Sequence, residues 1–141
     1  MSTAVRRAIY GKLAGDGTLT GMLATAPAGM AQNIFYDEAP DNAVFPFVIF
    51  SKSSGVPTEA FKDPSALETD IWLVKAVDRS TTADTAEAIS ERIKILLNDA
   101  TLSISGAVCL YLRRQSDVEY PELVEGNSYR HSGSLYRLVM D

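Results

Sequence analysis

Apolar residues recur at helical spacing in two segments of the chain. Near the N-terminus, Val5, Ile9 and Leu13 stand four residues apart, and the Gly-Asp-Gly run at 15–17 is expected to end this helix. A short helical turn over 18–24 can follow. The second helix is predicted from a cap at Thr81 or Thr82 to about residue 98. Its apolar stripe consists of Ala86, Ile89, Ile93, Leu96 and Leu97.

Shorter apolar runs predict five β-strands, at about residues 33–36, 45–53, 67–77, 107–115 and 134–140. We expect the second helix to pack on the sheet face that holds some of Phe47, Ile49, Ile71 and Leu73. The polar segments 53–65 and 116–133 contain glycine and proline and are interpreted as long projecting loops, the second with room for an irregular strand. The pattern predicts an α+β fold, with a mixed or antiparallel sheet backed by two main helices.

Length and charge narrow the class of protein. A chain of 141 residues suits one domain, here residues 1–141, with enough surface buried for one core. The net charge of -5 argues against a general nucleic-acid binder, which needs a basic face for phosphates. No apolar run approaches the roughly 18 residues of a membrane span, and the N-terminus does not have the pattern of a secretory signal.

The residues that could support catalysis are few. Cys109 is the only cysteine and lies in an apolar run, so we interpret it as a small buried hydrophobe rather than a reactive thiol. His131 is the only histidine and lies among polar residues, which favours an exposed loop or edge-strand position. Neither a nucleophile elbow nor a phosphate-binding glycine pattern is present. We therefore expect no enzyme activity, no metal and no cofactor.

Charged residues gather in three places. Asp37, Glu38 and Asp41 are interpreted as turn-forming, solvated groups. The pair Arg113-Arg114 could contact phosphate, but pairing with neighbouring acids is preferred. A second acidic stretch is either a solvated loop or a surface that faces a partner or passing DNA, and both readings stay open. It comprises Asp117, Glu119, Glu122 and Glu125.

Several segments, taken in order, resemble one known family. The helix near the N-terminus is followed by Ile34-Phe35-Tyr36-Asp37-Glu38-Ala39-Pro40 and then by Phe45-Pro46-Phe47-Val48. Ile71-Trp72-Leu73-Val74 leads through residues 78–80 into the second helix, and the chain finishes with Tyr129-Arg130-His131-Ser132 and Leu135-Tyr136-Arg137-Leu138. This order is similar to that of the tail-completion family (tail terminator, tail-to-head joining) of long-tailed phages and gene-transfer particles. The resemblance covers most of the chain.

The resemblance implies a structural virion protein in the tail and neck, assembled in the host cytoplasm. By this resemblance, the chain is expected to form a hexameric ring, as members of the family do. Such a ring caps the head-proximal end of the tail tube, stops tube growth and meets the head connector or stopper protein. The implied partners are other copies of the chain, the major tail tube protein, that connector, and DNA that passes the lumen without specific binding. The resemblance and the loops together suggest interface or lumen residues: Glu59, Phe61, Asp63, Asp117, Glu119, Glu122 and Glu125.

Acidic or neutral residues suit a DNA channel, because lysine or arginine would bind phosphates and oppose sliding. Two other classes remain as alternatives at this stage. One is a small oligomeric enzyme or ligand-binding α+β protein with a site between subunits. The other is a different neck component, such as a head-completion or adaptor protein, which fold class alone would not distinguish.

Overall fold

The computed structural model describes residues 2–58 and 67–141. Within these residues the elements follow one another as α1 (Ser2–Ala14), α2 (Gly17–Met22), β1 (Ile34–Tyr36), β2 (Phe47–Thr58), β3 (Leu67–Arg79), α3 (Asp84–Leu97), β4 (Cys109–Val124) and β5 (Asn127–Met140). The strands form one sheet in the order β1-β2-β3-β5-β4. β1 runs parallel to β2 and the other pairs are antiparallel, so the sheet is mixed, as predicted.

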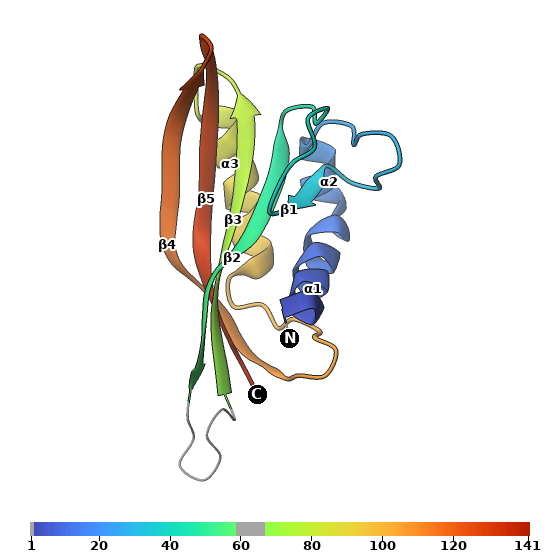
Figure 1. Cartoon of the computed structure of the whole chain (residues 1–141), viewed down its shortest axis with the longest axis vertical. Coiled ribbons are helices and arrows are strands. Elements are labelled where there is room, and N and C mark those ends of the chain that lie inside the picture. The colour runs from blue at the N-terminus through green and yellow to red at the C-terminus, as the bar shows by residue number, and fades with distance from the viewer. Residues whose placement is uncertain (1, 59–66) are drawn as a thin grey trace.

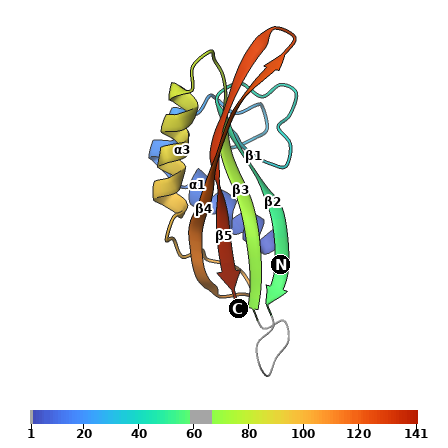
Figure 2. The ribbon, with the colours of Figure 1, turned by 90° about the vertical axis from the view of Figure 1, so that its left-hand side faces the viewer.

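The helices lie on one face of the sheet. Figure 1 shows α3 behind the strands and α1 beside β1 and β2, and both helices contribute to one core cluster with the sheet, while no helix of the described residues covers the opposite face. The molecule therefore has two layers, and we call the face without helices the open face. The β4–β5 hairpin extends past the end of α3 (Figure 2).

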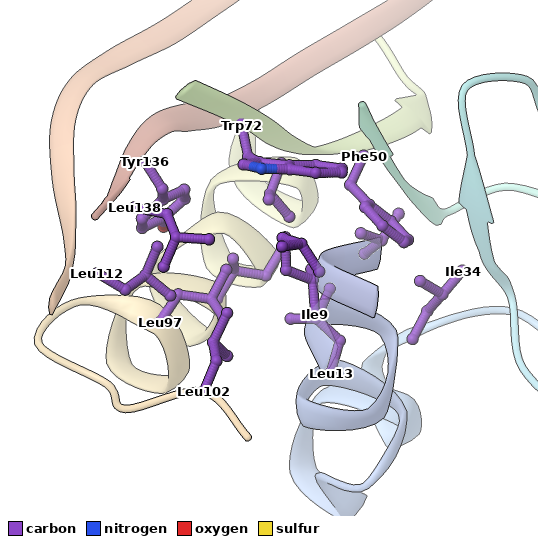
Figure 3. Packing of buried hydrophobic residues seen from close by; sticks show 14 of the residues in the cluster. Ile9, Leu13, Ile34, Phe50, Trp72, Leu97, Leu102, Leu112, Tyr136 and Leu138 are labelled. Carbon is purple, nitrogen blue, oxygen red and sulfur yellow. The ribbon is translucent and has the colours of Figure 1, made fainter. Parts of the chain in front are cut away.

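The core lies between the sheet and the helices, and both predicted helical stripes are buried in it. Val5, Ile9 and Leu13 of α1 are fully enclosed, as are most of the predicted positions of α3. Trp72 and Tyr136, from adjacent strands, face these helices (Figure 3). Burial of these large apolar and aromatic side chains is the main stabilising contribution to the fold.

The predicted sheet face was wrong. The helices pack on Val48, Phe50, Trp72, Val74 and Ala76. The residues expected there, Phe47, Ile49, Ile71 and Leu73, lie at the alternate positions of the same strands and thus on the open face. Both faces of these strands are apolar, so alternation alone did not identify the inner one. The open face has its own small cluster, in which Phe35, Phe47 and Val77 are buried with part of the 37–46 loop.

The segment 53–65 was predicted as a loop, and this is wrong for residues 53–58. There β2 continues and pairs with β3 as far as Thr58 opposite Leu67. β1 pairs only with Val48–Phe50, so the rest of β2 is a sheet edge, and an edge strand tolerates Pro57. The remainder of the predicted loop lies outside the described residues.

The segment 116–133 was also predicted as a loop, but it belongs to a long hairpin. β4 and β5 pair from Cys109 opposite Met140 to Val124 opposite Asn127. Glu125 (φ 50°) and Gly126 (φ 81°) make the two-residue turn, and positive φ at both positions matches the twist of a hairpin. β4 is the outer strand of the sheet, and two register shifts interrupt its pairing with β5. Polar residues are stable in this strand because much of it faces solvent.

The start of α3 differs in detail from the prediction. The helix begins at Asp84 after Ala83, without a side-chain cap, so the predicted threonine cap was wrong. Asp84 and Glu87 lie in the first turn, where acidic side chains are favoured by the helix dipole.

Candidate interaction surfaces

The four acids of the second acidic stretch do not form one surface. Because side chains alternate along β4, Asp117 and Glu119 lie on the α3 side, where they line a pocket of about 230 Å³ with residues of α3. Glu122 lies on the open face, in hydrogen-bond contact with His131. Glu125 is in the hairpin turn. The other suggested residues, Glu59, Phe61 and Asp63, lie outside the described residues.

Asp117 is satisfied within the chain. Its Oδ1 accepts a hydrogen bond from Ser134 Oγ at 2.8 Å and lies 3.2 Å from Lys94 Nζ and 3.4 Å from Arg114 Nη1. The hydrogen bond from Ser134, helped by Lys94 and Arg114, lowers the pKa of Asp117. This carboxylate ties β4 to β5 and α3, so it presents little uncompensated charge to a partner.

Glu119 instead faces another carboxylate. Its hydrogen bond with Glu87 of α3 and its charge both raise the pKa of Glu87, and Asp84 and Glu91 add to that effect. Glu87, Glu91 and Glu119 thus line the surface where α3 meets β4, with Asp84 nearby, and Lys94 of the same surface pairs with Glu91 at 3.0 Å. We call this group the acidic strip: Asp84, Glu87, Glu91 and Glu119.

His131 is buried, so the predicted exposed position was wrong. β5 lies between β3 and β4, which places His131 opposite Val77 on one side and Tyr120 on the other. Its ring stacks on Tyr120 with centroids 4.4 Å apart, and its Nε2 is 3.1 Å from Glu122 Oε1. Burial lowers the pKa of His131, while Glu122 acts in the opposite direction. Lys75 Nζ donates to Tyr120 Oη at 2.7 Å, so this end of the hairpin is fastened to β3.

The end of the hairpin carries exposed apolar residues. Leu123 is 74% exposed and Val124 is 45% exposed, and they stand between Glu122 and Glu125. We call residues 122–126 the hairpin tip. Figure 2 shows it at the free end of the β4–β5 ribbon.

A pocket lies at the β1 edge of the sheet, where α1 approaches β1. It has a volume of about 610 Å³, and we call it the α1–β1 pocket. The guanidinium of Arg6 lies 4.8 Å from the centre of the Tyr36 ring, a cation–π contact. The pocket is lined by Arg6, Arg7, Tyr10, Met30, Ala31, Gln32, Ile34, Phe35, Tyr36, Glu38, Ala39, Pro40 and Phe50. This pocket cannot be predicted from the sequence, because its residues come from three separate segments.

The predictions for Cys109, Arg113 and Arg114 fit the structure. Cys109 is a buried free cysteine. Arg113 pairs with Asp99 at 3.0 Å and Arg114 with Asp117, in line with the preferred pairing with acids. In residues 2–58 and 67–141, no cluster of three or more histidine, cysteine or acidic side chains is arranged to hold a metal ion. Among the helices of the same residues, none is long and apolar enough to cross a membrane.

Comparison with known proteins gives a consistent picture. The chain is similar in structure to a chain of the virion of a native gene transfer agent particle, with a TM-score of 0.70 and 18% identity over 99% of this chain and 97% of that one. A second solved structure matches with a TM-score of 0.57 and 12% identity, over 99% and 95% of the two chains. Curated protein sequences give no match. The model of the family described as tail completion protein gp17 matches residues 7–128, so the chain belongs to this family of structural tail-completion proteins.

Proposed function

We propose that the protein acts as a ring of six subunits at the head-proximal end of the tail tube. The supporting observation is the shape of the subunit: a helix-backed sheet with an outer strand, β4, that lies at the sheet edge and whose hairpin projects beyond the helices. Such a subunit has different surfaces at its two sheet edges. Contacts between different surfaces are head-to-tail, and they close into a ring when the rotation between neighbours divides a full turn.

In this proposal the ring caps the tail tube by covering its end, without a chemical reaction. A ring bound to the last layer of tube subunits covers the surface on which the next layer would dock, so tube growth stops. Its other side then meets the connector or stopper protein of the head. Several weak contacts made together on a preformed tube stabilise the ring much more than each contact alone. The working location is the neck of the particle, after assembly in the host cytoplasm.

DNA must pass such a ring without binding to it. We propose that the acidic strip faces the lumen, with Glu119 and Glu87 as its centre. Carboxylates repel phosphates and offer no counterion release, so DNA slides past them. Of the other acids suggested from the sequence, Asp117 is neutralised by Lys94 and Arg114, and Glu122 contacts His131. They are weaker candidates for the channel wall.

Electron microscopy of assembled tails tests the ring. The expected image is a sixfold ring at one end of each tube, and tubes of uncontrolled length when the protein is omitted. A single copy or a dimer at the neck would overturn the proposal.

Changes of charge at Glu87 and Glu119 test whether the acidic strip faces the lumen. The double change Glu87→Lys and Glu119→Lys should leave tails assembled but slow DNA delivery, whereas Glu87→Gln with Glu119→Gln should deliver normally. Equal delivery by the two variants, or a particle map with α3 on the outer wall, would contradict a lumen position for the acidic strip.

A further inference from the structure

We infer that the hairpin tip of one copy docks into the α1–β1 pocket of the next copy around the ring. This inference rests on the proposed ring and names the contact that closes it. It assigns a role to two surfaces of the described chain, centred on the exposed Leu123 and on the hollow between α1 and β1. One is an acidic, apolar projection, and the other is a basic, apolar hollow.

The hairpin tip is built for insertion. It presents Leu123, which is 74% exposed, next to the turn residue Glu125, whereas Glu122 and Val124 point to the open face, where they line a pocket with Phe45 and His131. The turn of the hairpin has a defined conformation, with φ of 50° and 81° at its two residues. Its base is fastened to β3 because Arg79 donates a hydrogen bond to Asn127. A tip that is already ordered loses little conformational entropy when it docks, so more of the contact energy remains as affinity.

The α1–β1 pocket complements the hairpin tip in its apolar lining and in its charge. Its apolar lining includes Met30, Ile34 and Pro40, which suit the side chain of Leu123. Two arginines, Arg6 and Arg7, line the same pocket against the single carboxylate of Glu38, so it is net basic. Arginine next to an aromatic ring is well placed to receive a carboxylate, since Tyr36 holds the Arg6 guanidinium. Opposite charges across such a contact favour the correct partner and fix its orientation.

The place of the two surfaces in the subunit favours a contact between copies. The β4–β5 hairpin ends at the top of the molecule in Figure 1, apart from α1 and β1 at the right, so the tip does not enter the α1–β1 pocket of its own chain. A tip therefore reaches a neighbour's pocket, while that neighbour's own tip remains free for the following copy. Repeating this contact gives a head-to-tail series, which is the kind of interface that closes into a ring.

Site-directed cross-linking tests the contact. In a Cys109→Ala background, Leu123→Cys and Met30→Cys are combined, and assembled tails are treated with a short thiol cross-linker. Met30 is an exposed residue of the pocket. The expected product is a ladder of cross-linked chains up to the hexamer. Leu123→Cys with Ile95→Cys is the matched control, because Ile95 is exposed on α3, away from the pocket.

The outcomes separate this contact from the ring itself. A sixfold ring with no ladder beyond that of the control overturns the docking contact and leaves the ring standing. Absence of any ring overturns both. Cross-linking of Leu123→Cys to a different tail or head protein also overturns the inference, because the tip is then occupied by that partner.

Charge exchange gives a second, independent measurement. Arg7→Glu and Glu125→Arg each replace an exposed charge, so the fold should be unchanged by circular dichroism. Each single change should lower the yield of assembled rings by about tenfold, the scale of one lost favourable charge contact. The double variant should recover most of that loss. Equal yields from the single variants and the unaltered protein would contradict the inference, as would a double variant no better than either single one.

Discussion

Arg92 of α3 holds both carboxylate oxygens of Asp16, the residue that caps α2. The Nε–Oδ2 distance is 2.9 Å and the Nη2–Oδ1 distance is 2.8 Å, and Oδ2 also accepts a hydrogen bond from the Leu19 amide at 2.8 Å. One aspartate therefore stabilises the start of a short helix and joins it to a helix far along the sequence. The hydrogen bond from Arg92 is the main reason that the pKa of Asp16 falls from 3.8 to about 2.

Removing the side chain of Arg92 should change how the free energy of unfolding depends on pH in the acidic range. Because the folded pKa of Asp16 is below its unfolded value, its contribution is complete above pH 4 and is lost as the pH falls toward 2. Arg92→Ala should raise the pKa of Asp16 toward 3.8 and flatten this part of the stability curve. NMR titration of the carboxyl group measures the pKa. Arg113→Ala, which breaks an exposed pair with Asp99, is the control and should leave Asp16 unchanged.

Two isoleucines of α3 should respond differently to the same change. Ile93 is 1% exposed and packs in the core, so Ile93→Ala should cost about 2–5 kcal/mol in the free energy of unfolding. Ile95, two residues later, is 69% exposed, and Ile95→Ala should stay within about 0.5 kcal/mol. Denaturant unfolding measures both values. A loss below about 0.5 kcal/mol for Ile93→Ala would mean that α3 is docked in another orientation.

The paired carboxylates of the acidic strip should be unfavourable to the isolated chain at neutral pH. The pKa of Glu87 is raised in the folded state, chiefly by Glu119, so stability is lost as the pH rises through that pKa. Glu87→Gln should therefore raise the melting temperature at pH 7 and have little effect at pH 3, where the carboxyl is protonated in both states. Glu125→Gln, in the exposed turn, serves for comparison. A lower melting temperature for Glu87→Gln at pH 7 would contradict this account.

The buried histidine should resist protonation. Burial lowers the pKa of His131 below 6.5, so the folded state loses stability as the pH falls from 6.5 to the folded pKa. Glu122 raises that pKa, so Glu122→Gln should lower it further. NMR titration of the imidazole gives the value in each variant. A rise of the His131 pKa in Glu122→Gln would show that the two side chains do not interact as the structure indicates.

The helices were predictable because each has one apolar face. Val5, Ile9 and Leu13 can be buried only if that stripe faces the sheet, so sequence spacing and structure agree. In β2 the pattern does not identify the inner face, because Phe47 and Phe50 are both apolar and lie on opposite faces of the strand. The inner face was decided by the fit of large side chains such as Trp72 against the helices, which spacing does not encode.

The interaction surfaces were harder to predict for two reasons. The hairpin is polar because its outer strand faces solvent, so it looked like a loop in the sequence. Because side chains alternate along a strand, Asp117 and Glu122 lie on opposite faces of the sheet, although only four residues separate them in the sequence. The α1–β1 pocket joins Arg6, Met30 and Tyr36, and only the folded chain brings these residues together.

The outer strand β4 also bears on how the protein can be stored before it is used. A long exposed strand edge is normally a site for indiscriminate aggregation. Asn98 and Asp99 cover part of this edge, because they hydrogen-bond to Arg114 and Leu112. Here the two register shifts twist the strand, Pro121 has no amide hydrogen to donate, and Arg113 adds exposed charge. These features discourage unselective strand pairing while leaving side-chain contacts available. In the proposed ring, the subunit can therefore accumulate ahead of tail assembly without pairing through this edge, and the tube determines when the subunits associate.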